Sequence, residues 1–130
     1  MNKKRVHTPE GVRDVYGTEY GQRSKLKAKL NKVFASYGYE GIRTPGFEFF
    51  DVFNSEKGTV SAREMFKFFD REGNTLVLRP DFTPSVSRAC ATYFNPDQQV
   101  VTLCYTGNTF VNILMKRIWE SVFLMQETCF

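Results

Sequence analysis

A strand-to-helix turn in this sequence places charged and hydroxyl side chains close together. The stretch "LVLRPDFTP" runs from an apolar strand into Arg79 and Asp81, and Thr83 followed by Pro84 predicts the start of a helix, with Thr83 as N-cap. A carboxylate accepts hydrogen bonds from an ammonium group, and a threonine hydroxyl can share that contact, so the turn could hold a small ligand. Asp81 could instead only stabilise the helix start, near the positive end of the helix dipole. The residues alone leave both interpretations open, and we expect Arg79 to form a structural ion pair.

The sequence contains few other groups for chemistry. His7 is the only histidine, and Cys90, Cys104 and Cys129 show no paired spacing. We therefore predict no metal site and no cofactor, and we interpret the cysteines as free thiols in a reducing compartment. Since no apolar stretch approaches the ~20 residues that span a bilayer, we expect a cytoplasmic protein without a membrane segment.

Length and composition indicate one globular domain. The chain has 130 residues, 42% of them apolar, including 13 phenylalanines. A domain of this size can bury a real core. The net charge is +4, to which the run at residues 3–5 contributes. Without a concentrated basic face in the sequence, we expect no nucleic-acid partner.

The turn must be positioned by a small set of elements. Apolar residues at helical spacing predict a helix near residues 18–37, with Thr18 as N-cap and Gly38 as its end. These apolar residues are Leu26, Leu30, Val33, Phe34 and Tyr37. A second helix is predicted over residues 83–94.

The other segments have extended character. Residues 39–53 are interrupted by Pro45, which is typical of an edge strand. Residues 65–69 and 75–78 predict a β-hairpin, and residues 100–106 and 109–112 predict two further strands. Hairpin-linked strands with helices beside them predict an α+β domain in which helices flank an antiparallel sheet.

Four motifs in this order resemble the histidyl group of class II aminoacyl-tRNA synthetases. "TPEGVRDVYGTEY" is similar to the start of that group. "SYGYEGIRTPGFEFFDVF" is similar to its motif 1, "MFKFFDREGNTLVLRPDFTPSVSRACATYF" to its hairpin and histidine-binding turn, and "VTLCYTGNTFVN" to the start of motif 2. The resemblance implies that Asp81 and Thr83 lie where the fold recognises the α-amino group of histidine. It also implies a dimer interface at Pro45, Phe47 and Phe49.

Two branches of this group are distinguished by particular residues. One branch is the synthetase, and the other is the regulatory subunit of ATP phosphoribosyltransferase, in the first step of histidine biosynthesis. Synthetases generally have a glutamate and a small residue where this chain has Asp81 and Phe82, so "LRPDFTP" resembles the regulatory branch. The resemblance implies a homodimer or higher oligomer, a short-form catalytic subunit as partner and histidine as a ligand.

The motif 2 segment supports the same branch for a chemical reason. Adenylation gathers negative charge around the α-phosphorus of ATP, and an arginine fork can hold carboxylate and phosphate oxygens together. The synthetases place that arginine where this chain has Val111, so we expect Val111 to line the histidine-like ligand site together with Asp81 and Thr83. Losing one such donor typically costs about 10²–10³ in rate. We therefore expect a non-catalytic regulatory subunit, with a fragment of a histidyl-tRNA synthetase as the alternative.

The last residues depart from the resemblance. We assign residues 1–112 to the leading part of a synthetase-like domain and residues 113–130 to a divergent tail. The tail has apolar residues at helical spacing, so it is either an amphipathic helix or an out-of-frame or truncated end. We expect the chain to be a truncated form of the regulatory subunit.

Overall fold

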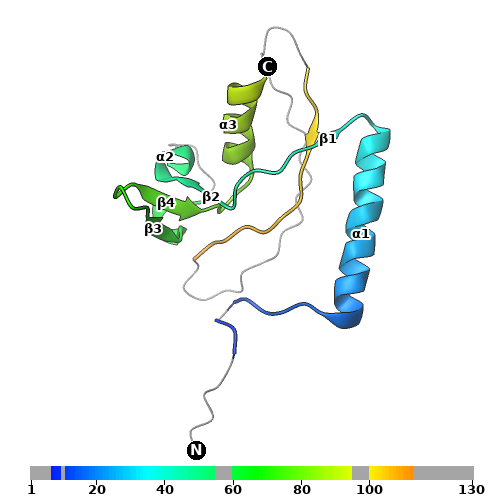
Figure 1. Ribbon diagram of the computed structural model, residues 1–130, viewed down its shortest axis with the longest axis horizontal. Helices are drawn as coiled ribbons and strands as arrows, with labels where there is room; N and C mark the ends of the chain where they lie inside the picture. Colours follow the sequence, from blue (N-terminus) through cyan, green and yellow to red (C-terminus); the bar gives the residue numbers. More distant parts are fainter. Residues whose placement is uncertain (1–6, 10, 55–59, 95–99, 113–130) are drawn as a thin grey trace, which may run out of the picture.

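The molecule combines three α-helices with two small sheets in the part of the chain that the structure describes. This structure, a computed structural model, describes residues 7–9, 11–54, 60–94 and 100–112 (Figure 1). In chain order the elements are α1 (Gly17–Ser36), β1 (Glu40–Gly41), β2 (Phe47–Phe49), α2 (Phe50–Phe53), a 3₁₀ turn (Ala62–Glu64), β3 (Lys67–Phe69), β4 (Thr75–Leu78), α3 (Thr83–Tyr93) and β5 (Leu103–Cys104). Helices beside an antiparallel sheet confirm the predicted α+β class. The predicted tail lies outside the described residues.

The larger sheet is antiparallel and has the order β2–β4–β3. β3 and β4 form the predicted hairpin, in which Phe68 lies opposite Leu76. β2 pairs with the other side of β4, with Phe47 opposite Leu78. As Pro45 indicated, the segment that follows it is an edge strand. The strand that leads to the candidate turn is therefore the central strand, held on both sides.

The hairpin turn is fixed by one carboxylate. Asp70 Oδ1 accepts hydrogen bonds from the backbone N–H groups of Glu72 and Asn74, at 3.0 and 2.8 Å, and Asp70 Oδ2 accepts one from the Asn74 side chain. These bonds, above all that from the Asn74 side chain, lower the pKa of Asp70. Gly73 has φ +85°, a left-handed conformation that favours glycine. The turn chemistry read from the sequence is confirmed.

A second, two-stranded sheet was not predicted. β1 pairs in parallel with β5, with Glu40 opposite Leu103. Of the strand predicted over residues 100–106, only β5 forms, and residues 109–112 form no strand. The backbone N–H groups of Phe110 and Asn112 donate instead to carbonyls of two separate segments, so no continuous ladder arises.

The predicted first helix is confirmed as α1, but its start differs. The helix begins at Gly17 after Tyr16, and Thr18 is not its N-cap, because Gly17 takes φ +59° and turns the chain one residue earlier. Gly38, with φ +83°, ends it as expected. No residue of α1 is buried, and the helix lies at one side of the molecule, apart from α3 and the larger sheet (Figure 1).

Two apolar clusters pack α2 and α3 against the strands and the segment around β5. One joins α3 to the segment around β5 and consists of Phe82, Val86, Cys90, Val101, Leu103 and Tyr105. The other lies between α2 and the larger sheet and consists of Phe53, Met65 and Val77. The side chain of Arg88 on α3 also donates to Glu48 of β2, at 2.9 and 3.1 Å. α3 is thus fixed on both sides, and its first turn is held beside the end of β4.

Candidate functional site

Asp81 acts as the stabilising side chain at the start of α3. Its Oδ1 accepts hydrogen bonds from the backbone N–H groups of Phe82, at 2.7 Å, and of Thr83, at 3.4 Å. Phe82, not Thr83, is the N-cap residue, so the predicted cap is wrong by one position. A carboxylate one residue before the cap reaches the first N–H groups and makes a threonine cap unnecessary. The helix-stabilising interpretation of Asp81 therefore has direct geometric support.

Arg79 connects three segments through backbone carbonyls. Its Nε donates to Asn108 O at 2.8 Å and its Nη1 to Thr44 O at 3.3 Å. The guanidinium also lies over the Phe82 ring, 4.3 Å from the centroid. Partial burial lowers its pKa from the usual value. Arg79 has no ion pair within the described residues, so the expected ion pair is replaced by carbonyl and ring contacts, which satisfy the guanidinium on its buried side.

The backbone of Arg79 also forms hydrogen bonds with the segments before β2 and after β5. Its N–H donates to Gly46 O at 3.0 Å, and its carbonyl accepts from the N–H of Phe110 at 2.9 Å. The N–H of Asn112 donates to Glu64 O at 2.7 Å. The segment after β5 is thereby held between the exit of β4 and the 3₁₀ turn.

Gly107 permits the close approach of this segment. A Cβ atom built on Gly107 would lie 2.6 Å from Arg79 Nη2 and 2.9 Å from Phe82 Cζ, which is closer than real Cβ contacts allow. Sequence reasoning did not single out Gly107 as a positioning residue. The available signal was a glycine directly after an apolar strand, which often marks a close backbone approach.

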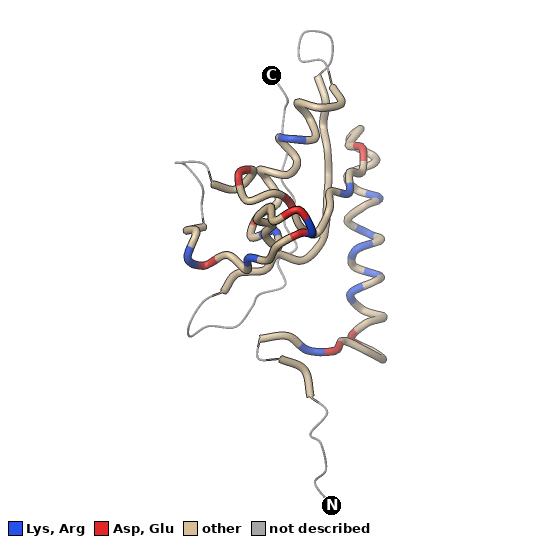
Figure 2. Tube along the Cα trace, turned by 60° about the vertical axis from the view of Figure 1, so that its left-hand side comes forward, with Lys and Arg blue, Asp and Glu red and all other residues tan. Residues whose placement is uncertain are grey.

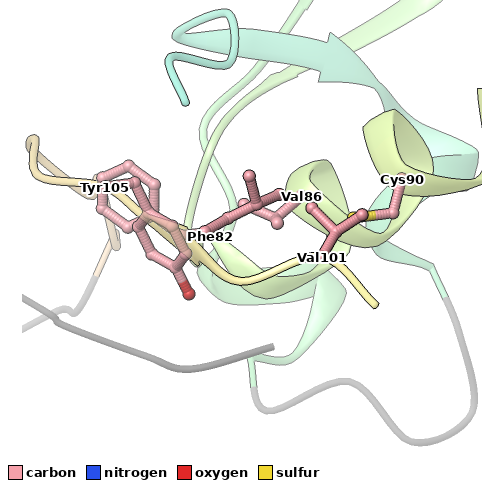
Figure 3. Close-up of a cluster of buried hydrophobic side chains, with 6 residues drawn as sticks. Phe82, Val86, Cys90, Val101 and Tyr105 are labelled. Atoms are coloured by element: carbon pink, nitrogen blue, oxygen red, sulfur yellow. The ribbon is translucent and has the colours of Figure 1, made fainter. Parts of the chain in front are cut away.

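The rings of Phe82 and Tyr105 pack against each other at the start of α3. The rings of Phe82 and Tyr105 lie 5.0 Å apart between centroids at 30°, and both residues are buried. Figure 3 shows the two rings side by side, with Val86, Val101 and Cys90 continuing the cluster along α3. The phenylalanine that distinguishes this turn from the synthetase pattern is therefore a core residue that fixes the start of α3 against the segment after β5.

Val111 belongs to the segment that reaches the turn. It is half-buried, and the backbone N–H of its neighbour Phe110 donates to the carbonyl of Arg79, at the entrance of the Asp81 turn. Asp81 and Thr83 share one turn and a hydrogen bond, whereas no direct contact of Val111 with either is described. The placement of all three residues around one ligand stays a prediction.

The three residues expected at a dimer interface lie on an exposed part of the sheet. Pro45, Phe47 and Phe49 are all exposed, and the two phenylalanines have 50% and 55% of their surface accessible. Strand alternation and the β2–β4–β3 register place six large apolar residues on this face, away from α2 and α3. They are Phe47, Phe49, Phe66, Phe68, Leu76 and Leu78, and we name them the open sheet face. None of the six is fully buried.

The other groups considered for chemistry contribute no site. Among the described residues, no three His, Cys, Asp or Glu side chains group in a way that could hold a metal ion. Cys104 is a free thiol, whereas Cys90 is disulfide-bonded, so the expectation of free thiols is wrong for Cys90. No helix within the described ranges is long and apolar enough to cross a membrane.

Comparison with protein families shows which family has this fold. The family model described as histidyl-tRNA synthetase matches residues 11–118, which include the turn, the hairpin and the segment after β5. The chain belongs to the histidyl-tRNA synthetase family. The resemblance read from its four motifs is confirmed.

Its relatives within the histidyl-tRNA synthetase family include regulatory subunits. The chain is 39% identical over 110 residues to the ATP phosphoribosyltransferase regulatory subunit of Acetivibrio thermocellus, and 41% identical over the same length to that of Ruminiclostridium cellulolyticum. Each match covers 85% of this chain and 26% of the relative. The chain thus spans about a quarter of the length of these relatives.

Solved structures of the family show the same fold. A structure from Bacillus halodurans, described as an ATP phosphoribosyltransferase regulatory subunit/histidyl-tRNA synthetase, matches 88% of this chain and 30% of its own with a TM-score of 0.76 at 26% identity. The apo histidyl-tRNA synthetase of S. aureus matches 81% of this chain and 29% of its own with a TM-score of 0.67 at 30% identity. Both branches therefore share the fold, and the branch must be argued from the site.

Proposed function

We propose that this chain acts as a non-catalytic regulatory subunit of ATP phosphoribosyltransferase, in the first step of histidine biosynthesis in the cytoplasm. The observation that carries the proposal is Val111 at the position where the synthetases have an arginine, in a segment bonded to the Asp81 turn through Phe110. The names of the relatives at 39–41% identity support the same branch.

The arginines beside the turn support the absence of adenylation. Arg79 donates to two backbone carbonyls and stacks on a ring, and Arg88 is paired with the buried Glu48. Each guanidinium has a structural role, so neither replaces the missing donor at Val111 without losing that role. Adenylation needs a donor preorganised for both the carboxylate and the phosphate.

Two measurements test this proposal. Adding the chain to the short-form catalytic subunit encoded in the same genome should change its phosphoribosyltransferase rate, since a regulatory subunit acts through that partner. Histidine-dependent ATP–pyrophosphate exchange by the chain should be absent. Exchange without an effect on the catalytic subunit would overturn the proposal and support a synthetase fragment. Val111→Arg should not create exchange activity, because one side chain does not restore a whole preorganised site.

Histidine is the ligand that the proposal assigns to the turn. Asp81 would accept from its ammonium group and Thr83 would share the contact. Isothermal titration with histidine tests this role. We expect histamine, which lacks the carboxylate but keeps the ammonium and the imidazole, to compete if the ammonium contact dominates.

The proposed assembly includes a second copy of the chain on the open sheet face. The charged neighbours Glu48 and Lys67 point to the other side of the sheet, so two copies can meet there without burying a charge. In sedimentation equilibrium with reductant, Phe49→Glu should give a monomer. Phe69→Glu is the matched control, because Phe69 is 72% exposed and lies on the opposite face. Equal effects of the two variants would exclude a specific interface there.

A further inference from the structure

Arg79 carries a positive charge that no carboxylate balances among the described residues. Its Nε and Nη1 donate to the carbonyls of Asn108 and Thr44, whereas its Nη2 donates to no acceptor within the described ranges. Burial lowers the pKa of Arg79 from its usual value. A half-buried charge without a counter-charge is costly, because carbonyl dipoles replace only part of the hydration that the charge loses. The Nη2 group is therefore a donor that an anion would stabilise.

The space beside Nη2 is kept open by a glycine. A Cβ atom on Gly107 would lie 2.6 Å from Nη2, so any other residue there would displace the guanidinium or cover this nitrogen. Thr44, whose carbonyl holds Nη1, is only 7% exposed, and its hydroxyl has no hydrogen-bond partner in the part of the chain that the structure describes. Buried hydroxyls are nearly always hydrogen-bonded. The contact between Arg79 and Thr44 thus contains two polar groups without partners, which favours a ligand at this position.

The guanidinium and the carboxylate of the turn lie against the same residue. Asp81 Oδ1 accepts from the N–H of Phe82 at 2.7 Å, and the guanidinium of Arg79 lies 4.3 Å from the centroid of the Phe82 ring. An α-amino acid carries its ammonium and its carboxylate on one carbon atom, so two groups that receive them must be neighbours. Arg79 and Asp81 meet this requirement, since both contact Phe82 from within one turn.

This pair of opposite charges favours a zwitterion over other charged ligands. A nucleotide phosphate at Nη2 would be repelled by the neighbouring carboxylate of Asp81, and an amine without a carboxylate would leave Arg79 unbalanced. The basic residues that could attract a polyanion follow one another along α1, at one side of the molecule and apart from α3 (Figure 2). An α-amino acid is the ligand class that both side chains fit.

We propose that Arg79 binds the carboxylate of an α-amino acid whose ammonium group is held at Asp81. The amino acid is histidine, an assignment that rests on the proposed function. Nη2 donates to a carboxylate oxygen, while Nε and Nη1 keep their carbonyl acceptors. The contact therefore does not provide the fork for carboxylate and phosphate that adenylation needs. Arg79 determines that the turn takes the amino acid in preference to the corresponding amine.

Isothermal titration with histidine and with histamine, which lacks the carboxylate, tests the inference. The unaltered chain should bind histidine at least tenfold more tightly, because of the charge-assisted hydrogen bond to its carboxylate. Arg79→Gln should abolish this difference and leave the affinity for histamine unchanged, whereas Asp81→Asn should weaken both ligands. Arg43→Gln is the matched control, since Arg43 is an exposed arginine next to Thr44, and it should keep the difference. If Arg79→Gln weakens both ligands equally, Arg79 has a structural role alone and the inference is wrong.

A measurement on the unaltered chain covers the case in which Arg79→Gln does not fold. Saturating histidine should shift the Nε–H resonance of Arg79 in a ¹⁵N NMR spectrum, and histamine should not. An unshifted resonance, or equal affinities of the unaltered chain for the two ligands, would overturn the inference.

The outcomes also separate the inference from the proposed function. If histidine binds no better than histamine while the chain changes the rate of the catalytic subunit, the inference fails and the function stands. If histidine is preferred through Arg79 and the chain has no effect on the catalytic subunit, the inference stands and the function fails. If histidine does not bind at all, the inference is wrong whatever the effect on the catalytic subunit.

Discussion

Asp81 has two candidate roles that a pair of substitutions separates. Its Oδ1 makes one good hydrogen bond to the N–H of Phe82 and a second, to Thr83 at 3.4 Å, that is too long to contribute much. One charge-assisted bond at a half-exposed site, together with the helix dipole, amounts to about 1–2 kcal/mol. Asp81→Ala removes all of it. Asp81→Asn keeps the acceptor and loses only the charge, which costs about 0.3–1 kcal/mol.

In urea denaturation followed by circular dichroism, the unaltered chain should therefore be the most stable, Asp81→Asn less stable and Asp81→Ala the least stable. If Asn destabilises as much as Ala, the hydrogen bond to Phe82 does not stabilise the helix start, and the reasoning from geometry is refuted. Titration with histidine tests the second role, which is ligand binding, because the ammonium group of the ligand loses its counter-charge in the Asn variant. We expect affinity to fall at least tenfold in Asp81→Asn. Unchanged histidine affinity in that variant would leave Asp81 as a structural residue alone.

Three further predictions concern the contacts that hold the site. Gly107→Ala should destabilise the fold by about 1–3 kcal/mol, because its Cβ would lie 2.6 Å from Arg79 Nη2; a neutral result in denaturation would show that the segment relaxes. Glu48→Ala should cost about 1–2 kcal/mol, since it removes a buried carboxylate from a partly exposed arginine on α3, and unchanged stability would mean that this pair adds nothing in solution. The hydrogen bond from Arg13 holds the pKa of Glu19 at about 2. Because this pKa is depressed, the Arg13–Glu19 pair should persist as the pH falls through the usual carboxyl range and be lost only near pH 2, which a carboxyl NMR titration measures.

The sequence was sufficient for elements with strong local signals. The hairpin followed from Asp70 and Gly73, whose turn chemistry needs no distant partner. α1 followed from its apolar spacing and from Gly38. The two predicted N-caps were wrong by two positions and by one, since the N-cap residue is Tyr16 in place of Thr18 and Phe82 in place of Thr83. At α3 the carboxylate of Asp81 makes the hydrogen bonds that had been assigned to the threonine.

Features that depend on contacts between distant segments could not be predicted in the same way. Arg79 was expected to pair with a nearby carboxylate, yet its partners are the carbonyls of Thr44 and Asn108, which lie 35 and 29 positions away. Carbonyls are present at every position and leave no trace in composition or spacing. The strand predicted over residues 109–112 failed for a related reason, since β propensity cannot show whether a partner strand is available.

The parallel pairing of β1 with β5 has a consequence for the order in which the chain acquires its structure. Glu40 finds its strand partner only at Leu103, more than sixty residues later. Closing so long a loop slows folding more than it lowers stability. On a ribosome, α1 and the β3–β4 hairpin can form as soon as they emerge, whereas β1 must wait for most of the chain to be synthesised. A pause in translation before residue 103 would therefore leave the β1 edge and the apolar side of α3 exposed to chaperones and proteases.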